Sequence, residues 1–355
     1  GADCRSGSAH HHMLRLKGAV AHYAWGDRFA LPELLEITAD GRPWAEIWYG
    51  THPRGPAQID ESLHLPAPSY LADEVGELPF IVKLLAAAAP LSLQTHPTVA
   101  QAAIGFAREN VAGIALDAPA RMYSDPHAKP EMVIALHRFD ALCGFVGADQ
   151  AVAQCSEAGA PDIAEHVRGH GVADTARAIL NGALFTAPTA PSRAMQQLNE
   201  HHHDPRSAVA LLMHHLRLAP GEALFLDAGC VHAYLSGLAL EVQGSSDNVL
   251  RAAFTNKHVN LAEFFAVANL SPTGDARVDT ETISAITTAY RSPAPFSVMR
   301  HEVNGAFSLT TTTEHTVLVC TSGSAGTLTR GSGAYLARNE TVDLHGTATL
   351  YSVSA

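Results

Sequence analysis

The sequence of 355 residues is poor in charged side chains (16%), has five cysteines, and contains no long uninterrupted apolar run. Its longest apolar stretch, residues 81–93, includes Lys83 and Pro90 and is too short to cross a bilayer. With 35 acidic and 23 basic residues the net charge is −12, and an acidic surface repels the phosphate backbone of nucleic acids. We therefore expect neither a membrane protein nor a nucleic-acid-binding protein, although a local group of Lys and Arg can still bind a small phosphorylated molecule.

The cysteines are isolated along the chain and odd in number. None forms a Cys-x-x-Cys pair, so neither a zinc knuckle nor a disulfide framework is indicated, and a reducing cytoplasm fits best. The first twelve residues precede Met13 and have no apolar signal core. We expect residues 1–12 to be a leader or an expression scar, and we exclude their three His from the site.

The chain is longer than a single hydrophobic core usually serves, so two or three domains are expected. Residues 14–82 contain short apolar and aromatic segments broken by Gly and Pro, which is typical of antiparallel strands. Strands are also predicted at residues 132–146 and from 218 to about 251. The tail, residues 296–355, is rich in Ser and Thr and has regularly spaced turns, which indicates a second small sandwich or barrel.

Helical patterns interrupt these strands. Residues 97–116 are rich in Ala, and residues 261–268 form a short helical stretch. Within residues 147–216, apolar residues recur at helical spacing in two groups: Val172, Ala176, Ile179 and Leu180, then Val209, Leu212, Met213 and Leu216. We interpret residues 147–216 as a helical insertion within a mainly β protein.

The segment SLQTHP places Gln94 and His96 two residues apart. In a strand, such residues point to the same face, so a carboxamide oxygen and an imidazole lie side by side. This pair is half of a metal site, or simply a polar pair at the mouth of a barrel.

The segment GEALFLDAGCVHAY has the spacing G-x5-D-x-G-x2-H of the second cupin motif, with Asp227 where that motif usually has Pro. A turn at Gly229 would reverse the chain and direct His232 into the interior. Between the two motifs, Glu131 follows Pro130 and opens an apolar strand, where a lone Glu is normally a solvated edge charge. Combined with Gln94 and His96, these residues make an N/O ligand set that suits Zn²⁺ or a similar divalent ion.

At this point the sequence resembles the type I mannose-6-phosphate isomerases, also called phosphomannose isomerases. The resemblance rests on five blocks in the family's order: YAWGD (23–27), AEIWYGTHPRGPA (45–57), LPFIVKLLAAAAPLSLQTHP (78–97), DPHAKPEM (125–132) and GCVHAYLSGLALEVQGSSDNVLRAAFTNKHV (229–259). It implies an aldose–ketose isomerase acting on mannose 6-phosphate and fructose 6-phosphate through a cis-enediol(ate). It also implies two cupin (jelly-roll-like) β-barrels with an inserted helical domain. The expected division is a catalytic cupin domain at 13–146 and 217–268, the helical domain at 147–216, and a second cupin-like domain at 269–355.

The resemblance further implies roles for individual residues. The zinc ligands would be Gln94, His96, Glu131 and His232, with one Zn²⁺ per chain or another divalent metal. Residues at positions that line the family's substrate pocket are Lys83, Ser92, Lys129, Glu241, Asp247 and Arg251. Among them Lys83, Ser92, Glu241 and Arg251 would bind substrate, and Lys129, Asp247 and Arg251 would be catalytic.

One position departs from the family. A His commonly precedes the Lys of the Lys-Pro-Glu sequence, whereas here Ala128 stands before Lys129 and His127 lies one residue further back. The general base is therefore open: Lys129 takes the proton if its pKa is depressed, or it only holds substrate oxygens. Asp247 orients Lys129 or relays a proton, or it is a turn-forming side chain.

Other features carry more than one interpretation. Arg251 suits a phosphate or a developing oxyanion, and Lys83, inside an apolar strand, calls for an anionic partner. Residues expected to be structural are Trp25, Trp44 and Trp48 in the barrel, His201, His202, His203, His214 and His215 at or on an amphipathic helix facing solvent, and Cys230, which is not expected to bind metal.

Two other classes of protein remain as alternatives. One is a different cupin enzyme, such as an iron-dependent oxygenase or an epimerase, although an oxygenase typically uses two His and one carboxylate without an amide ligand. The other is a sugar-binding cupin without activity. The expected partner is a small sugar phosphate, and the protein is expected to be a monomer or a homodimer.

Overall fold

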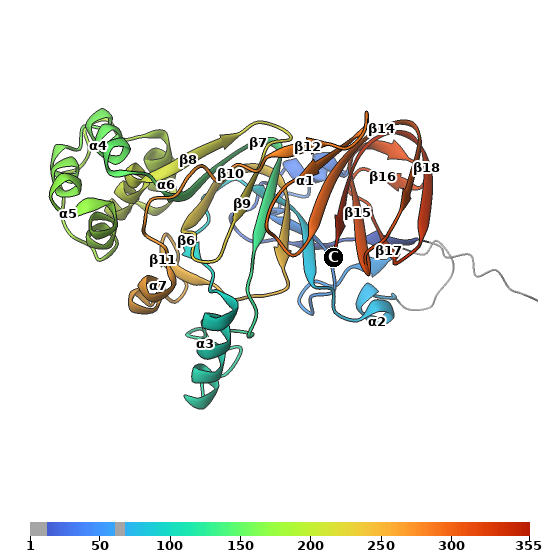
Figure 1. Cartoon of the computed structure of the whole chain (residues 1–355), viewed down its shortest axis with the longest axis horizontal. Helices are drawn as coiled ribbons and strands as arrows, with labels where there is room; N and C mark the ends of the chain where they lie inside the picture. Colours follow the sequence, from blue (N-terminus) through green and yellow to red (C-terminus); the bar gives the residue numbers. More distant parts are fainter. Residues whose placement is uncertain (1–12, 61–67) are drawn as a thin grey trace, which may run out of the picture.

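The computed structural model describes residues 13–60 and 68–355, so the expected leader, with Cys4, lies outside the described residues. The described chain is mainly β, as predicted, with two nine-stranded sheets side by side and most helices gathered at one end (Figure 1). None of the described helices is both long enough and apolar enough to span a membrane.

The central sheet is organised around one long strand, β10, which is hydrogen-bonded to β5, β6 and β7. Its strands are β2 (Ala19–Ala21), β3 (Glu46–Tyr49), β5 (Phe80–Ala87), β6 (Leu93–Thr95), β7 (Glu131–Phe145), β8 (Met213–Leu218), β9 (Ala223–Leu226), β10 (His232–Gly244) and β11 (Leu250–Ala253). All of the pairings are antiparallel. The strand predicted at residues 132–146 is confirmed as β7.

The C-terminal sheet contains the predicted strand-rich tail together with two strands from the start of the chain. Its strands are β1 (Leu14–Lys17), β4 (Gln58–Ile59), β12 (Thr280–Thr282), β13 (Thr287–Tyr290), β14 (Ser297–Thr310), β15 (His315–Ala325), β16 (Leu328–Thr329), β17 (Gly333–Ala337) and β18 (Thr341–Ser354). β1 pairs with β17 and β4, so the described chain begins in this sheet and not in the central one. Local sequence carries no signal for such a pairing because the partner lies more than 300 residues away.

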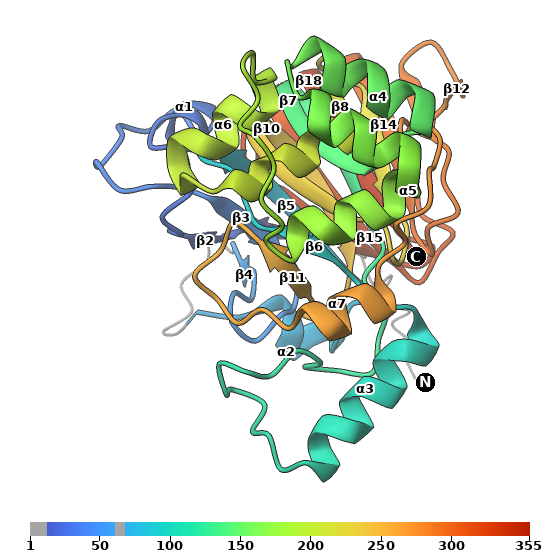
Figure 2. The ribbon, with the colours of Figure 1, turned by 90° about the vertical axis from the view of Figure 1, so that its left-hand side faces the viewer.

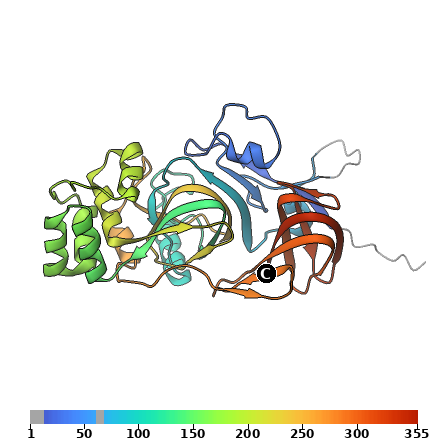
Figure 3. The same cartoon turned by 90° about the horizontal axis from the view of Figure 1, so that it is seen from above.

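The strands of both sheets are strongly curved (Figure 3). Among the described residues, however, the main path of hydrogen-bonded strands runs from β11 to β2 in the central sheet and from β12 to β4 in the C-terminal one, and no strand pairing joins the two ends of either path. The closed barrels expected from the sequence are therefore not formed by backbone hydrogen bonds.

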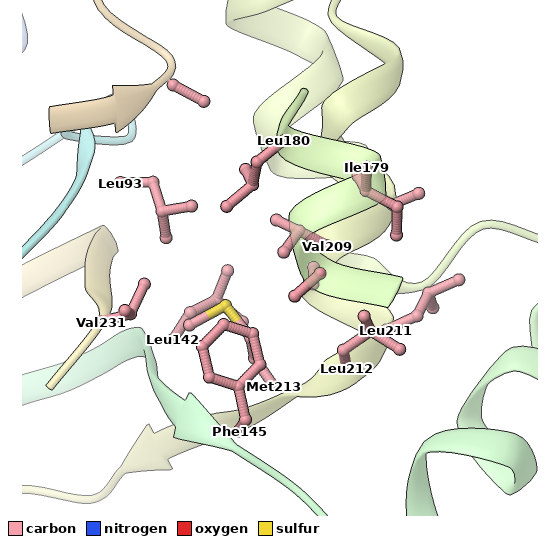
Figure 4. Close-up of a cluster of buried hydrophobic side chains, with 14 of the residues drawn as sticks. Leu93, Leu142, Phe145, Ile179, Leu180, Val209, Leu211, Leu212, Met213 and Val231 are labelled. Carbon is pink, nitrogen blue, oxygen red and sulfur yellow. The ribbon is translucent and has the colours of Figure 1, made fainter. Parts of the chain in front are cut away.

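Four helices follow one another between β7 and β8, where the helical insertion was expected: α4 (Ala148–Glu157), α5 (Pro161–Leu180), α6 (Arg193–His202) and the 3-10 helix η1 (Pro205–Leu212). Figure 2 shows α4, α5 and α6 across the end of the central sheet. Their apolar residues meet those of the sheet in one core, where Leu180 points toward Leu93 and Ile179 lies on the other side of the same helix (Figure 4). Because this helical face is buried, the predicted spacing in α5 is confirmed.

The helical prediction for the second group of residues is wrong for its last two members. Val209 and Leu212 lie in η1, but Met213 and Leu216 lie in strand β8, which pairs with β7 through Leu216 opposite Ala141. Over a short run, apolar residues spaced by three and four fit a helix or a strand equally well. Here the pairing with β7 makes the segment a strand. His214 and His215, expected on or beside a helix, are consequently strand residues.

Helix α3 (Val99–Val111) and helix α7 (Leu261–Val267) occupy two of the predicted helical stretches. The N-terminus of α3 has a capping box: the Thr98 hydroxyl accepts from the Gln101 N–H, and the Gln101 side chain accepts from the Thr98 N–H. Since α3 starts just after His96, this cap fixes the end of the segment that carries His96. Two short helices, α1 (Ala30–Leu34) and α2 (Leu71–Val75), were not predicted.

Candidate metal centre and substrate cavity

Three of the four expected metal ligands converge in the central sheet. One nitrogen of His96, one nitrogen of His232 and one oxygen of Glu131 all lie within 4.8 Å of one another, and all three residues are buried. The Glu131 Oε2 atom is 3.4 Å from His96 Nε2 and 3.3 Å from His232 Nε2. His96 follows β6, Glu131 opens β7 and His232 opens β10, so three strands supply one group each.

The hydrogen bonds of the two imidazoles favour a cation at this point. Nδ1 of His96 donates to the carbonyl of Asn248 at 2.6 Å, and Nδ1 of His232 donates to the carbonyl of Cys230 at 2.9 Å. In the neutral tautomers this leaves both Nε2 atoms as acceptors facing a carboxylate, and His96 Nε2 has no hydrogen-bond partner. Two unprotonated imidazole nitrogens that face a carboxylate are the arrangement that a divalent ion completes.

The protonation states of His96 and Glu131 also suit a metal site. Burial lowers the pKa of His96, so its ring is neutral. Burial raises the pKa of Glu131, and the opposing effect, led by His96, acts when an imidazole is protonated, so a proton added here goes to an imidazole and Glu131 stays ionised. A neutral imidazole and an ionised carboxylate are the forms that bind metal.

Gln94 lies beside these three groups. In the sheet it is directly opposite His232 on one side and Arg251 on the other. Its amide nitrogen donates to the hydroxyl of Ser92 at 3.0 Å, which leaves the amide oxygen as the atom available to a ligand. The structure therefore brings all four expected ligands and Ser92 together.

The turn at Gly229 also forms as predicted. Gly229 has a φ of +82°, a left-handed conformation that glycine adopts without strain. Its N–H donates to the carbonyl of His96 at 2.8 Å, so the turn before His232 is attached to the segment that holds His96. The carbonyl of Cys230 accepts the hydrogen bond from Nδ1 of His232. Burial raises the pKa of the Cys230 thiol to about 12, so the thiol stays protonated.

A cavity of about 420 Å³ adjoins this group and is lined by both Glu131 and His232. Six further expected residues line it: Lys83, Gln94, Lys129, Glu241, Asp247 and Arg251. Trp25 and Trp48 also line it, whereas Trp44 packs in the core between the sheets. Trp48 is buried and Trp25 packs against buried residues of the sheet, so both pack as expected and line the cavity as well.

Lys83 has the anionic partner that its place in an apolar strand predicted. Its Nζ lies 3.7 Å from Glu46 Oε2 and 4.3 Å from the centre of the Trp48 ring. In the sheet Trp48, Lys83 and Glu241 are directly opposite one another on β3, β5 and β10. Glu46 and Trp48 were not predicted because their part in the cavity depends on this register.

Glu241 is a buried carboxyl group held by a tyrosine. The hydroxyl of Tyr234 donates to Glu241 Oε2 at 2.6 Å, and it also lies 3.4 Å from Glu131 Oε2. Burial first, and then the charge of Glu131, raises the pKa of Glu241 to about 7, although Lys83 opposes this shift. Tyr234, two residues after His232, was not predicted.

Asp247 lines the cavity with Lys129, and its carboxylate contacts two groups that sequence reasoning missed. His52 Nε2 lies 2.7 Å from Asp247 Oδ2, and Arg54 lies 3.0 Å from Oδ1. Burial raises the pKa of Asp247, but the hydrogen bond from His52 and the charge of Arg54 lower it to about 2. Lys129 Nζ is 3.6 Å from Glu131 Oε1, so Lys129 also adjoins the metal group.

A third residue that sequence reasoning missed is Asn248. Its carbonyl accepts from His96, and its side chain donates to the carbonyls of Asp125 and His127. Asn248 thus links His96 to the loop that leads to Lys129.

Three further cationic side chains line the cavity: Arg54, Arg251 and Lys257. Burial lowers the pKa of Arg251, and burial together with the charges of Arg251 and Arg54 lowers the pKa of Lys257. Since Arg251 and Arg54 both act on Lys257, the three cations lie close enough together to favour a doubly charged anion such as a phosphate.

The remaining expected residues lie elsewhere. His127 and Ala128 line a different cavity, which also contains Pro130 and Phe225, so His127 does not replace the His that the family has before Lys129. His201 is exposed, but His215 is half-buried, 3.9 Å from Asp140, and His214 contacts the carbonyl of Thr273. The expectation that these His face solvent holds for His201 and His203, which are exposed, and is wrong for His202 and His215, whose Nε2 atoms are buried.

Comparison with known proteins gives consistent matches. Residues 13–148 match the family described as phosphomannose isomerase type I, catalytic domain. The chain is 36% identical to the mannose-6-phosphate isomerase of Salmonella typhimurium over 295 residues, which cover 73% of this chain and 75% of the relative. It is 32% identical to the mannose-6-phosphate isomerase of Escherichia coli, over 94% of this chain and 98% of the relative.

Solved structures match over almost the whole chain. The crystal structure of the apo form of mannose 6-phosphate isomerase from Salmonella typhimurium has a TM-score of 0.84 and 31% identity, covering 96% of this chain and 98% of that one. A crystal structure of mannose 6-phosphate isomerase bound with zinc and yttrium has a TM-score of 0.82 and 31% identity, covering 96% and 99%.

Proposed function

The chain belongs to the type I phosphomannose isomerases, and we propose that it interconverts mannose 6-phosphate and fructose 6-phosphate through a cis-enediol(ate). The observation that carries this function is the position of a three-residue metal group, His96, Glu131 and His232, at a cavity rich in cations. A metal and a phosphate-sized anion can thus be bound side by side, as an aldose–ketose isomerase acting on a sugar phosphate requires.

We propose that His96, Glu131, His232 and Gln94 hold one Zn²⁺. The zinc-bound relative and the N/O donor set support zinc, while another divalent ion would fit the same donors. When bound, the metal would polarise the substrate carbonyl and stabilise negative charge on its oxygen. The same donors without Gln94 would resemble an oxygenase triad, so oxygen consumption is a useful control assay.

We propose that Arg251, with Lys257 and Arg54 near it, binds the phosphate or the developing oxyanion. A guanidinium donates two parallel hydrogen bonds to such an anion and stays charged at every physiological pH. Lys83, Ser92 and Glu241 would bind sugar hydroxyls. Support for these roles comes from their position: Lys83 and Glu241 line the cavity, and Ser92 bonds to Gln94.

The proton transfer between C1 and C2 needs a group that can accept and return a proton on one face of the sugar. We propose Lys129 for this step, because it lines the cavity beside Glu131, and Asp247 as its orienting partner. With a pKa of about 2, Asp247 is ionised and a weak base at neutral pH, which suits orientation better than proton abstraction.

We further propose the cupin architecture of the family for this chain. The curved sheets would correspond to two cupin-like domains, at 13–146 with 217–268 and at 269–355, and helices α4 to η1 to an inserted domain at 147–216. The four cysteines among the described residues are all free, which supports a reducing compartment, and we propose the cytoplasm. A monomer or a homodimer is proposed for the oligomeric state.

The test is a coupled assay of fructose 6-phosphate formation from mannose 6-phosphate with zinc-loaded protein. We expect turnover, loss of turnover after chelation, and recovery after zinc is restored. A zinc-loaded protein that binds one metal per chain but does not convert mannose 6-phosphate would contradict the proposed function, and oxygen uptake would instead favour an oxygenase.

A further inference from the structure

We propose that His52 is a positioning residue for the reaction: its Nε2–H holds the carboxylate of Asp247 in place at the wall of the substrate cavity. The inference deepens the proposed function and rests on it. Neither the motif spacing nor the expected ligand and substrate residues include His52, which lies just beyond β3.

The hydrogen bonds of His52 determine its tautomer. The backbone N–H of Arg54 donates to Nδ1 of His52 at 3.1 Å, so this nitrogen carries no proton. The proton of the neutral ring is therefore on Nε2, which lies 2.7 Å from Oδ2 of Asp247 and donates to it. A turn of the main chain thus sets which atom of His52 faces Asp247.

The ring of His52 is also fixed in orientation. It packs edge-on against Trp48, with ring centres 5.3 Å apart and planes at 80°, and only 11% of its side chain is exposed. Arg54, the other partner of Asp247, is 65% exposed and therefore keeps much of its conformational freedom. Of the two partners, His52 is the rigid one.

Asp247 itself is attached through its main chain. Its N–H donates to Oδ2 of Asp125 at 2.9 Å, while its side chain remains 31% exposed. The backbone is thus held, and the rotation of the carboxylate is what His52 restricts. Since Asp247 lines the cavity with Lys129, a rotated carboxylate would change the field at the ammonium group proposed for proton transfer.

Trp48 connects the pair His52 and Asp247 to Lys83, which also lines the cavity. Its ring face carries the ammonium of Lys83 at 4.3 Å, and its ring contacts His52 four residues further along the chain. One aromatic side chain on β3 therefore contacts both His52 and Lys83. A substitution at His52 should introduce a side chain of similar size, so that Trp48 keeps its position beside Lys83.

The experiment compares His52→Leu, Asp247→Asn and the double variant in the mannose 6-phosphate assay. We expect His52→Leu to lower kcat at least about tenfold, in line with the loss of a hydrogen bond to a charged group, with zinc content unchanged and the protein still folded at the assay temperature. If His52 acts through Asp247, the double variant loses no more than Asp247→Asn alone. His52→Gln, which can present an N–H near the position of Nε2, should recover most of the loss.

The matched control is His22→Leu. His22 likewise packs edge-on against a tryptophan, Trp44, with ring centres 5.1 Å apart, and its Nδ1 donates to the carbonyl of Pro43 at 2.8 Å. It has no contact with Asp247, so this variant should turn over like the wild type.

Two results would overturn the inference while the wild type remains active: kcat of His52→Leu within twofold of wild type, or losses that multiply in the double variant. An inactive zinc-loaded wild type would contradict the proposed function instead, so the two failures are distinguishable.

Discussion

Two imidazoles and a carboxylate come together in this chain because each ring has its outer nitrogen committed to a backbone carbonyl. His96 is oriented by Asn248 and His232 by Cys230, which leaves the two Nε2 atoms directed at Glu131. Such outer contacts fix the tautomer and the ring plane before any ligand is bound. The proposed metal affinity therefore depends on main-chain positions as well as on the ligands.

Removal of one ligand should separate metal binding from substrate binding. His232→Ala deletes an imidazole that lies beside both Glu131 and Gln94, so we expect zinc affinity to fall by at least about 100-fold and activity to be lost. Arg251→Ala should keep the zinc and lower kcat/KM by roughly 100-fold, because it removes a donor to the anion. Metal analysis of the dialysed proteins together with the coupled assay checks both; normal turnover by Arg251→Ala would contradict its role.

Individual residues differ in how far the sequence predicts them. His232 follows from its motif spacing, and Lys83 calls for an anion because a buried cation needs one. The identity of that anion, Glu46, cannot be predicted because it depends on the pairing of β3 with β5. His52 and Asn248 were missed for the same reason: each acts on a residue more than 100 positions away in the chain.

At the scale of elements, a buried carboxylate joins helix α6 to the central sheet. Asp140 on β7 is 2% exposed, and neither of its carboxylate oxygens has a hydrogen-bond partner among the described residues. Three side chains surround it at longer range: Arg193 at 3.5 Å, Arg217 at 3.7 Å and His215 at 3.9 Å. These are charge contacts without a direct hydrogen bond, and Arg193 is the group that comes from α6.

Neutralising Asp140 should weaken the attachment of α6. Asp140→Asn removes the counter-charge of Arg193 and Arg217, whose side chains are 56% and 35% exposed, so we expect a loss of about 1 kcal/mol. Denaturant unfolding would measure this loss. Asp174→Asn, at an exposed position on α5, serves as the control and should stay within about 0.5 kcal/mol of wild type; an equally small effect of Asp140→Asn would contradict the account.

The C-terminal sheet contains a buried titratable group far from the metal centre. Burial lowers the pKa of His301 to about 4, and its ring bonds to the hydroxyls of Thr287 and Ser352. The folded state therefore binds this proton less readily than the unfolded state, whose His pKa is about 6.5. Its contribution to stability is complete above pH 6.5 and is lost as the pH falls from 6.5 to 4.

His301→Gln removes this titration. We expect the loss of stability between pH 6.5 and pH 4 to be smaller in the variant than in wild type by up to about 3 kcal/mol. Denaturant midpoints of the metal-free proteins across this range provide the measurement. Parallel pH curves for the two proteins would show that His301 does not contribute.

Elements with long, buried periodic faces are predictable from this sequence, and elements defined by distant partners are not. Helix α5 and strand β7 have enough apolar positions to show their period. Strand β8 is short, and its apolar residues fit a helix until pairing with β7 decides between the two. Strand β1 is recognisable as a strand, but its place in the C-terminal sheet follows only from contact with β17.

At the scale of the whole molecule, the two sheets share one hydrophobic core. Tyr49 and Val82 of the central sheet lie in the same buried cluster as Val317 and Val353 of the C-terminal sheet. The hydroxyl of Tyr49 also donates to the carbonyl of Gly331. The sheets should therefore unfold together, although the family resemblance treats them as separate domains.

A cavity in the shared core tests this coupling. Val317→Ala should lower the free energy of unfolding by about 2 kcal/mol. All three tryptophans lie at residues 25–48, so their fluorescence reports on the chain outside the C-terminal tail. We expect the midpoint to fall equally by tryptophan fluorescence and by circular dichroism, with no change for the exposed Val111→Ala. An unchanged fluorescence midpoint in Val317→Ala would show that the sheets unfold independently.

The central claim, that one metal held by Gln94, His96, Glu131 and His232 is required for isomerisation, is tested most directly by a zinc titration. Chelated protein receives zinc in increments, and bound metal and mannose 6-phosphate turnover are measured in each sample. The account predicts that activity is absent without metal, rises in proportion to bound zinc and reaches its plateau at one zinc per chain. Full turnover by the metal-free protein, or a plateau that bears no relation to the first bound zinc, would contradict it.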